Sequence, residues 1–239
     1  MGNLLSEESL SYVDYFNTNE ELKVIVQGLN LDENDSVLAI CGSGDQAFAF
    51  CEKARRVVAI DLDNSVLRYA KSRVDNLIQG NCENFFIPSS NQLLRPLIRK
   101  NLAYFLDIDV ARISENSTIF ELGVENDRPK SIISNVPSIE FVEINLIDAI
   151  EKIGCDHNKV YLSNAVDWLY YFEQKKDGSS PEKVVAELFD SLCQNLSKGT
   201  IIYCTDGSSK VHRDIEKLGC VNSRRIEERS WSPIIYEVI

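Results

Sequence analysis

Residues 37–46 read Val-Leu-Ala-Ile-Cys-Gly-Ser-Gly-Asp-Gln, an apolar run that ends directly in two closely spaced glycines. A nearly continuous apolar run, here residues 36–41, is typical of a strand that is buried on both faces of a sheet. Gly42 and Gly44 allow a sharp turn and a close approach of the backbone to a ligand. Residues 46–53 can form a short helix after that turn. The stretch therefore predicts a strand, a glycine turn and a helix.

The flanking segments extend this pattern in both directions. Residues 56–61 form a second apolar run that ends in Asp61, and an amphipathic helix is expected at 64–77. Strand, glycine turn, helix and strand make a βαβ unit, so we expect an α/β fold with a Rossmann-like, doubly wound and mostly parallel sheet. The other expected elements are a leading helix at 20–31, strands at 139–144, 159–162, 200–204 and 233–239, and helices at 181–196 and 210–218.

Residues 81–138 interrupt the alternation between the second and third expected strands. This segment is too long for an ordinary connection, so it should contain structure of its own, including a helix at 91–106. Arg95, Arg99 and Lys100 make that helix locally basic. We expect one domain, residues 1–239, that binds the ligand and carries 81–138 as an inserted cap or lid. The alternative is a purely structural insertion with a solvated basic face.

The charge balance limits the possible partners. The chain has 239 residues, and 25 Lys and Arg against 37 Asp and Glu give a net charge of −12. So acidic a chain repels phosphate backbones, and we expect no nucleic-acid partner. No apolar run approaches the length of a membrane span, so no integral membrane association is expected. An acidic body with a basic insertion indicates a small, anionic molecule as the acceptor substrate. The oligomeric state is not predicted.

The seven cysteines are scattered and contain no CxxC pair, and the two histidines lie far apart. This spacing does not fit a zinc site or a disulfide framework, so no metal is expected. Reduced thiols in a cytoplasmic protein are the simplest interpretation.

The glycine turn and the acid after the second strand together predict a pocket for an adenosine-containing ligand. Asp61 lies nineteen residues after Gly42 and is placed to accept hydrogen bonds from two ribose hydroxyls. The spacing of Gly42, Gly44 and Ala47 also satisfies the dinucleotide pattern of a dehydrogenase. Asp45 would set a carboxylate beside a pyrophosphate, whereas it suits the positively charged end of S-adenosylmethionine. We therefore expect S-adenosylmethionine as co-substrate, bound in part by residues Cys41, Gly42, Ser43, Gly44, Asp45, Asp61 and Leu62.

The later strand ends supply the remaining candidate residues. Asn145 and Leu146 follow the third strand and are expected at the adenine edge. Ser163 and Asn164 follow the fourth strand and are expected at the methionine end of the ligand.

The candidate catalytic residues lie just beyond the same fourth strand. Asp167 is the candidate base, with Tyr170 or Tyr171 as helpers. A structural role for Asp167, as a helix cap, is the alternative.

The series of helix, strand, glycine loop and strand with an acid resembles class I S-adenosylmethionine-dependent transferases. Ordinary methyltransferases of that class carry an acid two residues before a first glycine in this loop, whereas Ala39 and Cys41 occupy those two places here. The loop at 41–46 and the Asp-Trp motif in 161–168 are more similar to the 3-amino-3-carboxypropyltransferases that make the betaine-lipid headgroup from diacylglycerol. The resemblance implies transfer of the aminocarboxypropyl group to a small acceptor. The alternatives are a small-molecule methyltransferase, a non-catalytic S-adenosylmethionine binder and a dehydrogenase.

Overall fold

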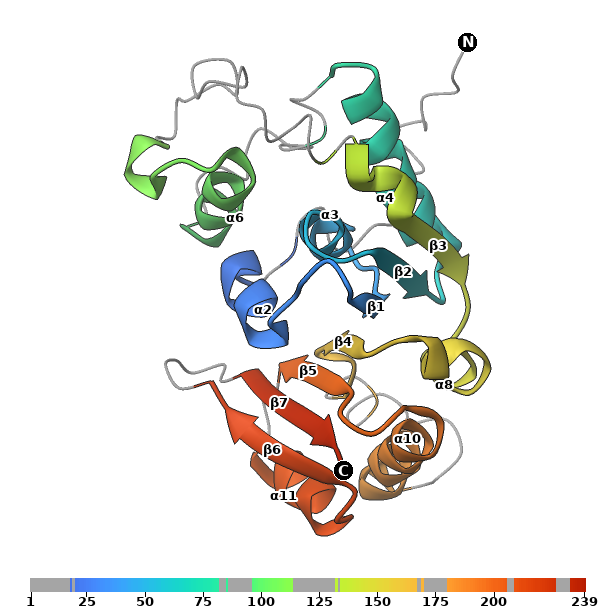
Figure 1. The fold of residues 1–239 in the computed structure, drawn as a ribbon. Coiled ribbons are helices and arrows are strands. Elements are labelled where there is room, and N and C mark those ends of the chain that lie inside the picture. Colours follow the sequence, from blue (N-terminus) through green and yellow to red (C-terminus); the bar gives the residue numbers. More distant parts are fainter. Residues whose placement is uncertain are drawn as a thin grey trace.

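The computed structural model describes residues 18, 20–81, 85, 96–113, 132, 134–166, 169, 180–205, 209–226 and 233–239. These residues build a seven-stranded sheet in the order β3-β2-β1-β4-β5-β7-β6, in which β7 and β6 run antiparallel to their neighbours (Figure 1). The predicted Rossmann-like, mostly parallel α/β fold is therefore confirmed. The strands are β1 Ser36–Ile40, β2 Arg56–Asp61, β3 Ile139–Glu143, β4 Lys159–Ser163, β5 Ile201–Thr205, β6 Val221–Arg225 and β7 Pro233–Val238.

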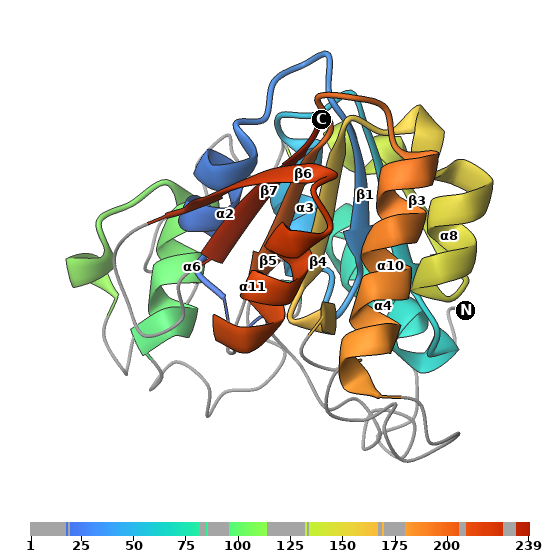
Figure 2. The same cartoon turned by 90° about the horizontal axis from the view of Figure 1, so that it is seen from below.

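Helices cover both faces of the sheet, and alternate strand residues feed two separate cores. In β1, Val37 and Ala39 pack with the helices α2, α3, α4 and α6, whereas Leu38 packs with α8, α10 and α11. Figure 2 shows α8, α10 and α11 in front of the sheet. The helices are α2 Leu22–Leu29, α3 Asp45–Cys51, α4 Asn64–Ile78, α6 Pro96–Leu106, α8 Leu146–Ile153, α10 Pro181–Asn195 and α11 Ser209–Lys217, with short 3-10 turns at Val110–Arg112, Val136–Ser138 and Gly154–Asp156.

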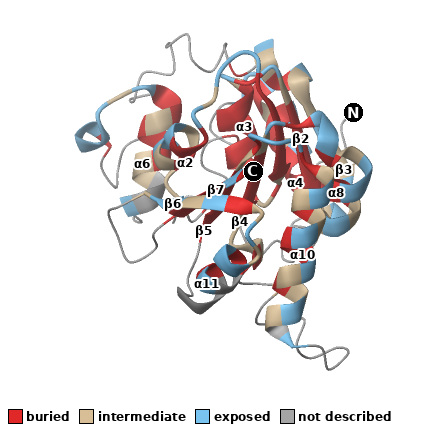
Figure 3. Ribbon diagram, turned by 60° about the horizontal axis from the view of Figure 1, so that its bottom comes forward, coloured by how far each residue is buried: buried red, intermediate tan, exposed pale blue. Residues whose placement is uncertain are grey.

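Burial follows the position of each strand in the sheet (Figure 3). The central strand β1 is buried along almost its whole length, as its apolar run predicts. At the sheet edges, β3 and β6 are largely exposed or half-buried. This explains why β6 was not expected from the sequence: the run Val-Asn-Ser-Arg-Arg presents polar residues to solvent. The short helix α8 was also not expected from the sequence. It begins after only two residues that follow the end of β3.

The described helix of the insertion, α6, packs against α2 and not only against the sheet. The buried side chain of Asn101 accepts a hydrogen bond from the backbone N–H of Leu22, with an N–O distance of 3.0 Å. Its amide nitrogen donates to the backbone oxygen of Glu20 at 2.8 Å. Helix α6 thereby satisfies a donor at the start of α2, where the first N–H groups have no partner within the helix. The insertion fixes the segment that leads into α2.

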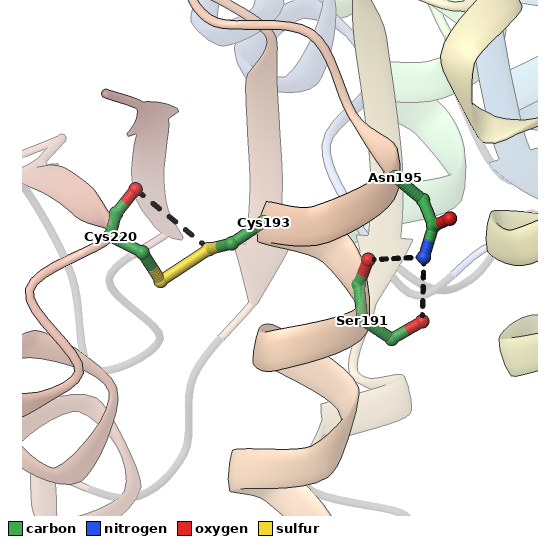
Figure 4. The surroundings of a disulfide bond; sticks show 4 residues. All are labelled: Ser191, Cys193, Asn195 and Cys220. Carbon is green, nitrogen blue, oxygen red and sulfur yellow. Dashed lines mark hydrogen bonds between the residues drawn. A yellow bond between two sulfur atoms is a disulfide. The ribbon is translucent and has the colours of Figure 1, made fainter.

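A disulfide joins Cys193, near the end of α10, to Cys220, just before β6 (Figure 4). The Cα atoms lie 6.1 Å apart, which is a normal separation for such a bond. The prediction that all thiols are reduced is therefore wrong, because a separation of 27 residues in the chain gave no sign that α10 and the β6 edge would meet. Since disulfides are rare in the cytosol, the expected cytoplasmic location loses the support that the thiols gave it. Among the described helices, none is long and apolar enough to cross a membrane.

The left-handed backbone of Gly44, at φ +88°, opens α3 and gives a test of the loop. A Cβ at Gly44 would lie 2.9 Å from both the Ala70 and Phe48 side chains, whereas a Cβ at Gly80, at φ +79°, would meet nothing within 4 Å. Gly44→Ala should therefore lower the free energy of unfolding by about 2–5 kcal/mol, and Gly80→Ala by only about 1–2 kcal/mol. Denaturant unfolding measures both, and equal losses would contradict the close packing at Gly44.

His157 makes the stability of the fold depend on pH. It is 2% exposed, and its Nδ1 lies 2.9 Å from the Ser36 hydroxyl. Burial, with a smaller effect from Arg56, lowers the pKa of His157 to about 4. In the unfolded chain His157 therefore binds a proton near pH 6.5, whereas in the folded chain it binds one only near pH 4. The protein loses stability as the pH falls through this window.

His157→Gln removes this titration. The difference in unfolding free energy between wild type and His157→Gln should shrink as the pH falls from 6.5 to 4. Denaturant unfolding at several pH values measures it, and a difference that stays constant would show that His157 does not titrate in this way.

Candidate functional site

The predicted cofactor residues within the described part of the chain lie along one edge of the sheet. Strands β3, β2, β1 and β4 are parallel neighbours, so their carboxyl ends meet at this edge. It carries residues 41–45 after β1, 61–62 at the end of β2, 145–146 after β3 and 163–164 at the end of β4. Ligands of open α/β sheets bind at such an edge, beside the strand where the order reverses. Asp167, Tyr170 and Tyr171 lie outside the described residues.

The glycine loop leaves β1 as a tight turn. The backbone N–H of Cys41 still pairs with Ile60 of β2 at 2.7 Å, and the N–H of Gly44 closes the turn on the oxygen of Cys41 at 2.8 Å. Gly42 has a left-handed φ of +48°, and a Cβ built there would meet no atom within 4 Å. The loop therefore presents open space beside Gly42, where a ligand can approach the backbone.

Asp61 faces this loop from the end of β2. Its carboxylate accepts the backbone N–H of Asp63 at 3.0 Å, and the nearby backbone of Gly42 also favours its charged form. Burial raises the pKa of Asp61, although these backbone donors act in the opposite direction. Leu62 follows with 73% of its surface exposed, which is unusual for a large apolar side chain at a strand end. An acid and an apolar surface thus stand next to the open space at Gly42.

Asp45 is committed to contacts within the protein. Its Oδ1 lies 2.7 Å from Nη2 of Arg73, and both side chains are almost fully buried. Its Oδ2 accepts the backbone N–H of Thr18 at 2.7 Å and the hydroxyl of Ser43 at 2.9 Å. The prediction that Asp45 binds the cationic end of a cofactor stays untested, but its charge is already compensated by Arg73.

Arg73 connects the loop to the insertion. It donates to the backbone oxygen of Ser43 at 2.9 Å and twice to the backbone oxygen of Phe85, at 2.9 and 2.7 Å. The guanidinium also lies 5.1 Å from the ring centres of Phe48 and Phe85. The conformation of the glycine loop therefore depends on Arg73, which no sequence pattern singled out.

Residues after β3 close the other end of the edge. Asn145 begins α8, and its side-chain oxygen accepts the N–H of Asp148 at 2.8 Å. Leu146 is half-buried and packs against the core on the α8 face. The backbone N–H of Ile144 pairs with the oxygen of Asp61 at 3.1 Å, which holds this turn next to Asp61. The expected adenine-binding role of Asn145 and Leu146 stays a prediction.

At the end of β4, Ser163 takes a left-handed backbone conformation with φ +52°, at an irregularity in the pairing with β5. Its hydroxyl hydrogen-bonds to Glu20, a residue that precedes α2, and lies 3.4 Å from the side-chain oxygen of Asn164. A left-handed serine needs support from its surroundings. The contact with Glu20 shows that the chain before α2 belongs to this edge.

Glu20 is the centre of a polar group that we name the Glu20 cluster. Its Oε1 also accepts the hydroxyl of Tyr161 at 2.9 Å, and its Oε2 accepts the hydroxyl of Thr205 at 2.7 Å. Gln46 joins through its amide nitrogen, 3.0 Å from the Tyr161 hydroxyl. The members of the Glu20 cluster are Glu20, Gln46, Tyr161, Ser163 and Thr205.

Most of this cluster was not expected from the sequence. Glu20 was only the first residue of an expected helix, Tyr161 was expected in the strand at 159–162, and Thr205 follows the strand expected at 200–204. The available signal was polar residues at the ends of buried strands, and it was used only for Ser163. Since Glu20 and Thr205 are 185 positions apart, their contact depends on the strand order.

The basic residues of the insertion are partly engaged. Lys100 pairs with Glu21 at 2.6 Å, with both side chains about one-third exposed or less. Arg95 lies outside the described residues. The anionic acceptor therefore stays a prediction. Within the described part of the chain, no group of three or more His, Cys, Asp or Glu side chains could hold a metal ion.

Removal of Arg73 should destabilise the protein strongly. Arg73→Met leaves the buried carboxylate of Asp45 without a counter-charge, which should lower the free energy of unfolding by about 3–5 kcal/mol. The matched variant Arg56→Met breaks the exposed pair with Glu140, at 3.0 Å, and should change it by at most about 1 kcal/mol. Adding Asp45→Asn to Arg73→Met should recover part of the loss. If the loss of unfolding free energy in the double variant equals the sum of the losses in Arg73→Met and Asp45→Asn alone, the two charges are not coupled.

No protein-family model and no curated protein sequence matches the chain. Solved structures that resemble it include a precorrin-8w decarboxylase from Methanobacterium thermoautotrophicum, with a TM-score of 0.51 and 13% identity over 96% of this chain and 95% of that chain. Another is the precorrin-6y C5,15-methyltransferase from Geobacter metallireducens GS-15, with a TM-score of 0.52 and 12% identity over 94% of this chain and 90% of that chain. At such identities the likeness establishes the fold. The chain has the Rossmann-like α/β fold of class I methyltransferases, with the strand order 3-2-1-4-5-7-6.

Proposed function

We propose that the protein is an S-adenosylmethionine-dependent transferase that transfers a methyl group to a small acceptor. The observation that carries this proposal is the corner that the carboxylate of Asp61 forms with the backbone of Gly42, where a Cβ would meet nothing within 4 Å. This corner lies at the carboxyl edge where β1 and β2 pair in parallel. A carboxylate at the end of the second strand is suited to accept ribose hydroxyls.

The residues present fit an adenosine-containing cofactor. Open space lies beside Gly42, and the exposed Leu62 offers an apolar surface for the base. Gln46 supplies a further sign, because its side-chain oxygen is buried and has no hydrogen-bond partner in the described part of the chain. Such an orphaned acceptor is expected where a ligand completes the hydrogen bonding.

When bound, S-adenosylmethionine supplies a sulfonium whose methyl carbon is open to a nucleophile. The protein's own part is to bind and orient. Asp61 would hold the ribose, Leu62 and Asn145 would bound the base, and the ends of β1 and β4 would position the reacting end against the acceptor. Alignment of this kind supplies a large share of the rate in transfer reactions. Asp167, with Tyr170, remains the predicted proton acceptor beyond β4.

The transferred group separates two related proposals. Resemblance to aminocarboxypropyltransferases rests on the loop with Asp45 and on a motif that includes Asp167. Asp45 is bound by Arg73, and Asp167 lies outside the described residues. The fold resembles that of a structure named as a methyltransferase. These observations favour methyl transfer, with aminocarboxypropyl transfer as the second candidate.

A dinucleotide cofactor fits the topology less well. The dinucleotide-binding fold has six strands in the order 3-2-1-4-5-6, whereas here the antiparallel β7 lies between β5 and β6. The expectation that Asp45 repels a pyrophosphate no longer contributes, because Arg73 compensates its charge. Strand order is therefore the argument for S-adenosylmethionine over NAD.

Calorimetric titration with S-adenosylhomocysteine tests the proposal. The wild type should bind it, and Asp61→Asn should weaken binding on the order of 10- to 100-fold, because a hydrogen bond to a charged group is lost. Asp75→Asn, an equal charge change at an exposed position of α4, is the matched control and should leave the affinity unchanged. Absence of binding by the wild type would refute the cofactor.

Product analysis with S-adenosylmethionine then identifies the reaction. Methyl transfer releases S-adenosylhomocysteine, and aminocarboxypropyl transfer releases methylthioadenosine. Methylthioadenosine as the enzyme-dependent product would overturn the methyl proposal in favour of the second candidate. Neither product with any acceptor, despite tight cofactor binding, would indicate a non-catalytic binder.

A further inference from the structure

The carboxylate of Glu20 has no counter-ion within the described part of the chain. Burial raises the pKa of Glu20, even though hydroxyls of Ser163, Thr205 and Tyr161 stabilise its charged form. No lysine or arginine in the described part of the chain forms an ion pair with it, in contrast to Asp45. Neutral hydroxyls compensate a desolvated charge only in part. The Glu20 cluster is therefore incomplete in electrostatic terms.

The hydrogen-bond geometry leaves room for one more donor. A carboxylate can accept about four hydrogen bonds, two on each oxygen. Oε1 of Glu20 accepts two, from Tyr161 and Ser163, whereas Oε2 accepts one, from Thr205. As a residue Glu20 is half-buried, and the remaining acceptor position of its carboxylate lies on Oε2.

Gln46 offers a second acceptor in the same cluster. The residue is 6% exposed, and its amide nitrogen is used by Thr18 and by the Tyr161 hydroxyl. Its oxygen accepts nothing from the described residues. A group that carries several donors and a positive charge matches both open acceptors, and a primary ammonium is such a group.

The Glu20 cluster also lies at the right place along the edge. Asp61 ends β2 and Ser163 ends β4, and both strands are neighbours of β1. Their ends are therefore about 10 Å apart, two strand spacings. A ligand whose ribose is held at Asp61 and that crosses the glycine loop after β1 brings its opposite end to Glu20.

We infer that Glu20 binds the α-ammonium group in the amino-acid portion of the cofactor and is its counter-charge. This inference rests on the proposed function and replaces Asp45 by Glu20 as the acid at the cationic end. Asn101 of the insertion is a positioning residue, since it holds the backbone of Glu20. Asn101 thereby lets the insertion contribute to cofactor binding indirectly, by holding Glu20 in place.

Three ligands separate this inference from the proposed function. S-adenosylhomocysteine carries the ammonium group; its deaminated analogue has hydrogen in place of the amino group; methylthioadenosine lacks the whole amino-acid portion. Calorimetry gives the dissociation constant of each for wild type and for Glu20→Gln. The matched control is Glu21→Gln, which removes a charge at the neighbouring position. Glu20→Asp, which keeps the charge but withdraws it by one methylene group, is the second variant if Glu20→Gln fails to fold.

We expect Glu20→Gln to weaken the binding of S-adenosylhomocysteine on the order of 10- to 100-fold. The affinities for the deaminated analogue and for methylthioadenosine should stay unchanged. Glu20→Asp should show a smaller loss with the same selectivity, and Glu21→Gln none. Equal losses for S-adenosylhomocysteine and its deaminated analogue would overturn the inference, because Glu20 would then act only through the fold. Unchanged affinity for all three would overturn it as well. If wild type binds none of them, it is the proposed function that fails.

Discussion

The buried ion pair between Arg73 and Asp45 holds together segments that lie far apart in the chain. Through it, helix α4 is tied to the glycine loop at Ser43, to the insertion at Phe85 and, by way of Asp45, to Thr18 before α2. Such a pair adds little stability compared with apolar packing, but loss of one partner leaves a desolvated charge. Its consequence is therefore a single arrangement of the loop, and the carboxyl edge of the sheet depends on that arrangement.

The same ion pair changes the interpretation of the acids at this edge. Asp45, Asp61 and Glu20 are carboxylates at this edge, and each has a different environment. Asp45 is compensated by a guanidinium, and Asp61 by backbone N–H groups beside open space. Among the described residues, the donors to the Glu20 carboxylate are neutral hydroxyls. Since the type of compensation determines what a carboxylate can still bind, the proposed cofactor contacts fall on Asp61 and Glu20 rather than on Asp45, which is already paired with Arg73.

Sequence patterns predicted the α/β class, the parallel strands of the sheet and the edge at which Asp61 and Ser163 stand. They succeed because a strand buried on both faces must be apolar along its length and because a glycine turn has few alternatives. They failed at β6, whose edge position admits polar residues, and at the disulfide of Cys193 and Cys220. Among the described strands, β6 pairs only with the nearby β7, so its edge position follows from the order of the whole sheet, and the disulfide depends on how α10 packs beside that edge.

The local sequence by itself determined the βαβ unit around Gly42 and, with it, the presence of an acid near the glycine turn. Only the tertiary structure decided which acid faces which partner. Arg73 reaches Asp45 because α4 packs over the loop, and Glu20 reaches Ser163 and Thr205 because α6 fixes the chain before α2 over β4 and β5. Periodicity and turn chemistry act over a few residues, whereas the pairing of buried charges depends on strand order and helix packing. For that reason the fold could be predicted from the sequence, and the charge arrangement of its binding edge could not.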